Sequence, residues 1–398
     1  MDFHTVLALA VLLGAGLQVA QSQWTLRVSL FWVGLLAYVA LAAIQVLFTP
    51  ADAAGEQRLF AGLQWYGLVG GAAMILSAQY LLRDRDWSSF VDCMIVGAVA
   101  AGALVVAEAV TNGASHSLFP GLYGAPGLLR ERPAGAFNLP NYFGVFAALA
   151  TLLAIHRFWT IRGRWRKLLV GVSTAVIAAA LFLSFSRGAL IALGGGLVYV
   201  AYSRSRPLGV VVAAGLLMLA VLGSSLFYEA RLGLTNPNDT LHEAQAGLET
   251  SDEGRLAGGA VSIRLFERDP IFGIGFGQYH FVSRIYESGN EATFAHNWYA
   301  NVLAEQGVVG IGLVAIVASA LVGGVRRAAP ERRQIAVAVL LGYAIANLFT
   351  ESPTDMSASS VAWLVIGGAF ASAGSALAKT RLNAVRRVGR SRNPRSFI

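Results

Sequence analysis

Residues 168–228 hold three apolar runs in succession: LLVGVSTAVIAAALFLS (168–184), RGALIALGGGLVYVAY (187–202) and LGVVVAAGLLMLAVLGSSLFY (208–228). Each run is close to the length of about 20 helical residues that crosses a hydrocarbon core. None of them alternates apolar with polar residues, as the strands of a membrane barrel do. The pattern therefore predicts membrane-spanning α-helices.

Similar runs recur along the whole chain, which has 398 residues, is 56% hydrophobic and 13% charged, and has a mean hydropathy of +0.60. A soluble domain usually carries about 25% charged residues. We therefore expect an all-α polytopic membrane protein with a single transmembrane domain over residues 1–398. The expected spans are 3–20, 26–48, 59–82, 90–110, 139–156, 168–184, 187–202, 208–228, 297–324, 334–350 and 358–378.

The first run, 3–20, could instead be a signal peptide. It lacks a basic amino-terminal region and a clear cleavage site, so we interpret it as a span. Eleven spans place the N-terminus outside the cytoplasm, and twelve would place it inside.

Arginine and lysine gather in four short segments, namely 157–167, 203–207, 325–333 and the tail 379–398. Short loops rich in these residues stay in the cytoplasm, and all four segments fall on one side of the expected spans. The net charge of +8 thus reflects topology and attraction to anionic membrane lipids. Because the basic residues are scattered over separate loops, nucleic acid is not an expected partner.

The longest break in hydrophobicity, residues 229–296, is rich in acidic residues. By alternation this large loop lies outside the cytoplasm, which in a bacterium means the periplasm. The segments 111–138 and 351–357 fall on the same side, as does the corner Ser184–Gly188.

The corner reads Ser-Phe-Ser-Arg-Gly, with Ser186 and Arg187 between two apolar runs. An arginine at that depth is costly unless it is paired or faces water. It is either a turn residue that reaches the membrane surface or an anion clamp, because a guanidinium matches two phosphate oxygens at once.

His296 stands at the outer mouth of a span, where a neutral imidazole could act as a general base. Asn297, Asn301 and Glu305 follow at intervals of four and form one stripe on the helix. The stripe either supports the histidine or only bonds to neighbouring helices.

The stretch from Gly254 begins as an expected helix. Arg255 shares a face with small residues, whereas Arg264 and Arg268 lie on nearly the opposite face. Arg255 is therefore the better anion-binding candidate. The glycine run 273–277 lacks the ending of a phosphate loop and is interpreted as a tight turn.

Residues 132–141, RPAGAFNLPN, lead into another span. Pro140 suits the first turn of a helix. Asn138 or Asn141 either caps this helix or lines an outer cavity. The sequence shows no metal-binding cluster of Cys and His and no Walker motif. It also lacks the pair of broken helices that is typical of many transporters.

Taken together, these pieces resemble the O-antigen ligase and polymerase superfamily of bacterial membrane glycosyltransferases. The resemblance is carried by Ser184–Gly188, Arg255–Gly277, His296–Asn297 and Glu305–Gly310, in that order. Residues 135–141 are similar to an earlier Asn-Pro-Asn-like element of the family, from which they depart because Leu139 separates Asn138 from Pro140.

The resemblance implies a GT-C-like fold of about twelve helices with a large periplasmic loop, in the bacterial inner membrane. It implies a donor glycan linked to undecaprenyl diphosphate, and neither metal ion nor cofactor. Ligases join the glycan to lipid A–core, whereas polymerases join it to another lipid-linked repeat.

The residues fit this chemistry. Arg187 and Arg255 would neutralise the diphosphate leaving group, and His296 would deprotonate the acceptor hydroxyl, with inversion at the anomeric carbon. Glu305 or Glu351 could orient the imidazole. We expect a ligase, with a polymerase as the alternative. A flippase or exporter of lipid-linked glycan is the non-enzymatic reading, which the crowding of polar residues on one side disfavours.

Overall fold

The computed structural model describes residues 29–49, 55–82, 86–111, 132–222, 241–283 and 295–372. Within these ranges, only the backbone is described for residues 220–222 and 241–253. In this part of the chain every regular element is helical: α2 (Leu30–Leu47), α3 (Gly55–Leu81), α4 (Trp87–Val110), α6 (Pro140–Thr160), α7 (Arg164–Leu183), α8 (Arg187–Arg204), α9 (Arg206–Leu222), α11 (Leu241–Arg268), α12 (Tyr279–Val282), α13 (Trp298–Arg326), α14 (Pro330–Ala346), the short 3-10 helix η2 (Ser352–Thr354) and a C-terminal helix, Met356–Ser372. The expected span 3–20 and the basic tail 379–398 lie outside the described residues.

Six of the described helices are long and apolar enough to cross a membrane, namely α2, α3, α4, α6, α7 and α13. The other expected spans in this part are helices too (α8, α9, α14 and the C-terminal helix), but they are shorter or less apolar. Large apolar side chains such as Leu36 and Leu47 point outward, as in a helix that faces lipid. The chain is a multi-pass membrane protein, as predicted, and the number of eleven or twelve crossings stays a prediction.

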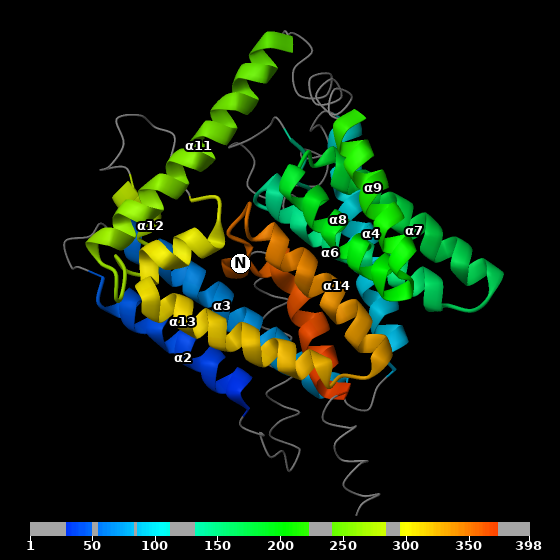
Figure 1. Cartoon of the computed structure of the whole chain (residues 1–398), viewed down its shortest axis with the longest axis horizontal. Coiled ribbons are helices and arrows are strands. Elements are labelled where there is room, and N and C mark those ends of the chain that lie inside the picture. Colours follow the sequence, from blue (N-terminus) through cyan, green and yellow to red (C-terminus); the bar gives the residue numbers. More distant parts are fainter. Residues whose placement is uncertain are drawn as a thin grey trace, which may run out of the picture.

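Helix α6 forms the centre of one group of helices and is the most deeply buried of the six spans (Figure 1). It begins at Pro140, as predicted, and packs against α4, α7, α8 and α14. Its side chains Phe143, Leu149 and Leu152 are wholly enclosed. The core of this group therefore runs along α6.

Small residues bring α6, α8 and α14 close together. Gly144 of α6 faces Ser186, and a Cβ on Gly144 would lie 2.6 Å from the Ser186 Cβ. Gly196 of α8 packs against Leu152, and Gly342 of α14 packs against Leu149. Such contacts let membrane helices approach closely without a hydrophobic driving force between them.

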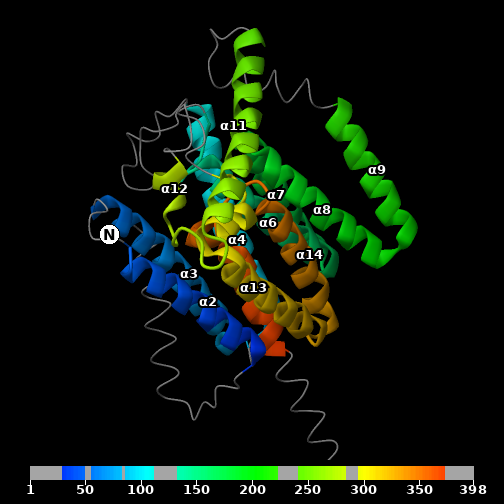
Figure 2. The same cartoon turned by 60° about the vertical axis from the view of Figure 1, so that its left-hand side comes forward.

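A second group is formed by α2, α3 and α13, which lie side by side in Figures 1 and 2. Helix α13 is kinked at Gly307, whose φ is 60°. The main chain of the preceding loop fills the break: Ile274 N donates to Ala304 O (3.0 Å) and Val308 N donates to Pro270 O (2.9 Å). The glycine run 273–277 turns sharply here, as predicted, with positive φ at Gly273, Gly275 and Gly277.

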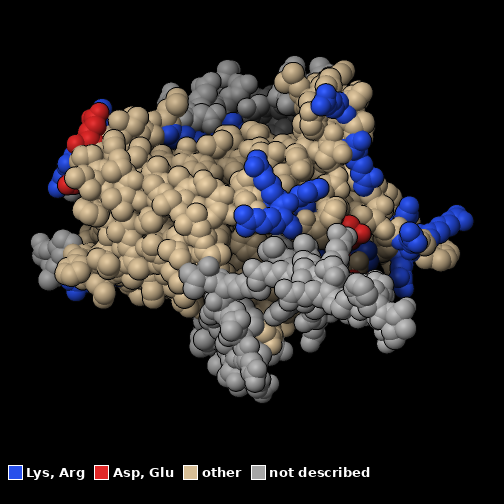
Figure 3. All heavy atoms as spheres, turned by 60° about the horizontal axis from the view of Figure 1, so that its bottom comes forward, with Lys and Arg blue, Asp and Glu red and all other residues tan. Residues whose placement is uncertain are grey.

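The basic turns between helices meet at one end of the molecule. Arg157 at the end of α6 pairs with Asp92 at the start of α4, with N–O distances of 2.6 and 2.8 Å. Arg332 at the start of α14 donates to Leu82 O (3.2 Å) and Gly368 O (2.9 Å). Figure 3 shows Lys and Arg gathered in clusters on an otherwise mostly uncharged surface. This end matches the side that the sequence assigns to the cytoplasm.

The segment 229–296 contains more helix than the sequence predicts. Helix α11 begins at Leu241, well before Gly254, and stands out from the bundle in both views (Figures 1 and 2). Its first half contains only two large apolar residues, Leu241 and Leu248, so the apolar period that reveals a helix in a sequence is weak there. Residues 229–240 and 284–294 of this segment lie outside the described part.

We predict that Gly307→Ala lowers the stability of the protein. A Cβ at Gly307 would lie 2.5 Å from Ile271 O and 2.6 Å from Pro270 O, and the φ of 60° disfavours alanine. The expected loss is about 1–3 kcal/mol, visible as a lower Tm in detergent. The control is Gly312→Ala in the same helix, where a Cβ meets nothing within 4 Å. That variant should be as stable as the parent or slightly more stable, and an equal loss in both variants would contradict the prediction.

Candidate functional site

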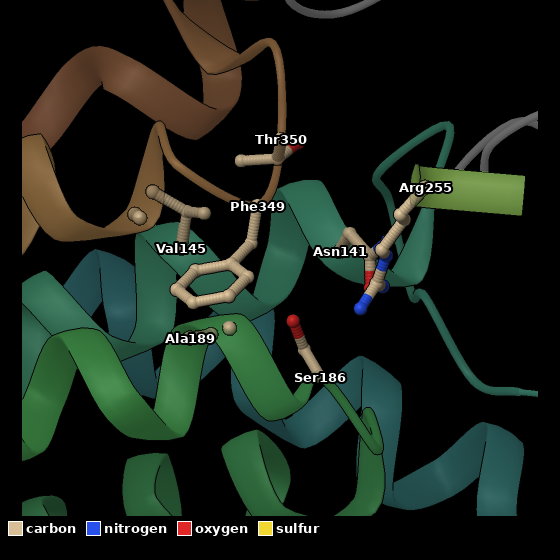
Figure 4. A pocket seen from close by; sticks show the side chains of 9 residues that line it. Asn141, Val145, Ser186, Ala189, Arg255, Phe349 and Thr350 are labelled. Carbon is tan, nitrogen blue, oxygen red and sulfur yellow. The ribbon is translucent and has the colours of Figure 1, made fainter. Parts of the chain in front are cut away.

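A pocket lies at the end of the bundle opposite the basic turns. It is lined by Asn141, Val145, Ser186, Gly188, Ala189, Arg255, Ala346, Phe349 and Thr350 (Figure 4). These residues come from α6, α8, α11 and the end of α14. With its open mouth included, the pocket has a volume of about 210 Å³.

Two helices begin at this pocket. Asn141 belongs to the first turn of α6, and Ser186 is the N-cap of α8. Helix N-termini carry partial positive charge and unpaired N–H groups, which suit an anion. The Ser186 side chain is buried and makes no capping hydrogen bond to its own helix. The pocket is thus polar and electropositive on the side that α6 and α8 form.

Arg255 enters the pocket from α11, and its guanidinium points between Asn141 and Ser186 (Figure 4). Helix α11 is held in place next to it, because Tyr279 Oη of the short helix α12 donates to Gly258 O at 2.7 Å. Arg264 and Arg268 are exposed. Of the three arginines of α11, Arg255 is thus the one that lines the pocket, and anion binding by Arg255 stays a prediction.

Arg187 is the first residue of α8 and is half-buried. Its neighbours Ser186 and Gly188 line the pocket, but Arg187 is not among the lining residues. The backbone just before it is unusual, since Phe185 has a φ of 50°. The structure brings Ser186 and Arg255 together and leaves Arg187 beside them, so diphosphate binding by Arg187 stays a prediction.

His296 lies in a turn that is tied to the end of α14. Trp298 N donates to Asn347 O (2.9 Å), and Asn297 caps α13 by accepting from Tyr299 N (3.0 Å) and Ala300 N (3.2 Å). His296 itself has a φ of 50°. A left-handed conformation in a non-glycine residue costs about 1–3 kcal/mol and is kept only where neighbouring contacts impose it.

Glu351 supplies such contacts. Its carboxylate accepts the backbone N–H groups of Ala295 and His296, and its Oε1 is buried with no hydrogen-bond partner. Glu305 acts elsewhere, because its carboxylate accepts from the N–H groups of Gly277 and Tyr279, the latter at 2.9 Å. Of the two acids that the sequence leaves open, Glu351 is the one bonded to the histidine turn, through the main chain.

The remaining polar residue of the α13 stripe is Asn301. Its side chain is buried, and its Oδ1 has no hydrogen-bond partner. Asn297 and Glu305 both bond to nearby backbone, so each has a structural task. The supporting role of these three residues in catalysis stays a prediction.

The electrostatics keep His296 neutral. Burial lowers the pKa of the imidazole, and the positive charge of Arg255 lowers this pKa further. A histidine with a lowered pKa is unprotonated near pH 7 and can accept a proton. Burial also raises the pKa of Glu351 to about 7, although its two N–H bonds act in the opposite direction.

Residues 172–315 match the protein-family model described as O-antigen ligase. This segment belongs to the O-antigen ligase superfamily. It starts within α7 and ends within α13, so the superfamily segment contains Ser186, Arg187, Arg255 and His296. By this match the segment resembles membrane glycosyltransferases of the O-antigen ligase or polymerase type. A comparison with curated proteins gives no match.

Several pocket residues lie outside the superfamily segment. Asn141 precedes it, whereas Phe349 and Thr350 follow it. The sequence suggested that Asn141 could line a cavity, but nothing in it pointed to Phe349 or Thr350. Phe349 and Thr350 follow an apolar run and belong to no recognisable motif. They reach the pocket only because the end of α14 packs against α8.

We predict that Arg255→Gln raises the pKa of His296, because it removes the charge that disfavours the imidazolium. The rate at which diethyl pyrocarbonate modifies His296, followed by peptide mass spectrometry, reports the neutral imidazole. The midpoint, the pH at which this modification rate is half-maximal, should be higher in Arg255→Gln than in the wild type. The matched control is Arg264→Gln on the exposed face of the same helix, which should leave the midpoint unchanged. Equal midpoints in wild type and Arg255→Gln would contradict the prediction.

We also predict that Glu351→Ala slows glycan transfer by about 10- to 100-fold, because the His296 turn loses the acceptor that holds it. The loss should fall on kcat rather than on the KM for donor. Glu351→Gln keeps an acceptor oxygen and should retain more activity. The control is Glu331→Ala, an exposed acid at the basic end of the molecule. Wild-type kcat in Glu351→Ala would count against the role.

Proposed function

We propose that this enzyme transfers a glycan from undecaprenyl diphosphate to an acceptor hydroxyl on the periplasmic face of the bacterial inner membrane. The observation that carries the proposal is the convergence of Arg255 and His296. Arg255 lines a pocket between two helix N-termini, and its charge acts on the His296 imidazole. An anion site beside a neutral base is what transfer from a glycosyl diphosphate requires.

Arg255 and Arg187 hold the diphosphate in this mechanism. As the bond between the anomeric carbon and the phosphate oxygen breaks, negative charge grows on the leaving diphosphate. A guanidinium in a partly dry pocket stabilises that charge strongly, and the N-termini of α6 and α8 add to it. The arginines thereby supply the positive charge that a metal ion supplies in other transferases, and we expect transfer to be metal-independent.

His296 activates the acceptor. Its imidazole takes the proton of the acceptor hydroxyl while the oxygen forms a bond to the anomeric carbon and the diphosphate leaves. A single displacement of this kind inverts the anomeric configuration. No nucleotide is consumed, because the lipid diphosphate brings its own leaving group.

The charge distribution supports a pocket on the periplasmic side. The pocket lies at the opposite end of the bundle from the turns of Arg157, Arg204 and Arg332. Short basic loops tend to stay in the cytoplasm, and this tendency supports a pocket that faces the other side of the membrane. The confinement of the pocket to one end supports an enzyme rather than a flippase, which needs access from both faces.

Lipid A–core is the acceptor that we propose, which makes the enzyme an O-antigen ligase. The test offers purified protein in lipid an undecaprenyl-diphosphate glycan, with lipid A–core in one tube and only further donor in the other. We expect product on lipid A–core, no loss with a chelator, and at least a 100-fold loss in His296→Ala and Arg255→Gln. Laddering in the second tube alone identifies a polymerase instead.

The control variant is Arg268→Gln, which changes an exposed arginine of the same helix and should transfer normally. Tm and gel-filtration profiles show whether each variant is folded. Near wild-type transfer by a folded His296→Ala protein would overturn the assignment of the base, and the same result for Arg255→Gln would overturn the diphosphate site.

A further inference from the structure

Arg132 connects two walls of the pocket without lining it. Its Nε and Nη2 donate to Ser184 O at 3.0 and 2.7 Å, and Nη2 also donates to Asn141 Oδ1 at 2.9 Å. Ser184 is the C-cap of α7, whereas Asn141 lies in the first turn of α6. One guanidinium thus joins segments that are about forty to fifty residues apart in the sequence.

The segment that carries Arg132 is itself anchored. Ala134 N and Gly135 N donate to Glu108 Oε2 of α4, at 2.9 and 2.7 Å. Gly135 has a φ of 58° and lies against Val105, where a Cβ would come within 2.9 Å of a Val105 methyl group. The backbone next to Arg132 is therefore fixed to α4, and its guanidinium is presented from a rigid base.

Ser184 is two residues before Ser186, and Phe185 between them has a φ of 50°. Holding the Ser184 carbonyl therefore holds the strained corner that turns Ser186 into the pocket. Asn141, the second partner of Arg132, lines the pocket near Arg255 (Figure 4). Loss of either bond would free one of the two polar walls that face the Arg255 guanidinium.

We propose that Arg132 is a positioning residue that presets Asn141 and Ser186 around Arg255 for a diphosphate. The proposal rests on the proposed function. Arginine suits the task because its planar fork reaches two acceptors in fixed directions, whereas lysine offers one flexible point charge. Without the Arg132 guanidinium, Asn141 and Ser186 become ordered only when the donor binds. The cost of ordering them lowers the affinity for the donor.

A purely structural role is the competing explanation, and the chain provides a matched control for it. Arg332 also binds two backbone carbonyls from other segments, those of Leu82 and Gly368, and it lies over the Trp87 ring. It does so at the basic end of the molecule, far from the pocket. Arg332→Lys therefore reports the cost of losing a carbonyl-binding arginine that has no part in the site.

The experiment compares Arg132→Lys with Arg332→Lys in full-length protein in lipid. We expect Arg132→Lys to raise the KM for donor by about tenfold with a smaller change in kcat. Arg332→Lys should lower Tm and leave both constants, per folded molecule, at wild-type values. Wild-type KM in Arg132→Lys, or the same kinetics in both variants, would overturn the proposal.

A double-mutant cycle tests the route of the effect. If Arg132 acts through Asn141, the KM effects of Arg132→Lys and Asn141→Ala should not add. Fully additive effects would overturn this route.

Binding of inorganic diphosphate, measured as a Tm increase, needs no turnover and should weaken in Arg132→Lys but not in Arg332→Lys. This readout separates the proposal from the proposed function, which fails if Arg255→Gln and His296→Ala transfer glycan normally.

Discussion

The close approach of α6, α8 and α14 is the contact on which the site depends. Glycines at the crossings allow it: Gly144 lies against Ser186 and Gly188 lies against Phe349. Between apolar helices in a membrane, association relies on such packing, because lipid is as apolar as the helices themselves. The same glycines that pack the core therefore bring Ser186 and Phe349 to one pocket at the helix ends.

The two ends of the bundle show different chemistry. At the basic end, arginines bind a carboxylate or backbone carbonyls, as Arg157 does with Asp92 and Arg332 with Gly368. At the pocket end, the non-glycine residues Phe185 and His296 adopt positive φ. Strained backbone is kept where function requires it. The contrast supports the pocket end as the site of reaction.

Helix α11 brings a charged side chain to a pocket that is otherwise formed by apolar membrane helices. A charged side chain inside an apolar helix is costly, so an arginine that must reach the pocket is better supplied from outside the bilayer. Helix α11 is largely polar and packs beside α13, where Gly258 O accepts from Tyr279 Oη. It delivers Arg255 to a pocket whose other walls are made by membrane helices, and the charge of Arg255 adds to the burial that lowers the pKa of His296.

Local patterns were sufficient for the helical class, the start of α6 at Pro140, the glycine turn and the inward face of Arg255, because a helix repeats with a period that its own residues carry. They also indicated which turns share the basic end. They could not show that Glu351 rather than Glu305 bonds to the histidine turn, or that Arg132 ties Ser184 to Asn141. These bonds tie together segments that are far apart in the chain, and the helical period of a sequence does not specify which helix ends meet. Only the tertiary packing of the helices decides which ends meet.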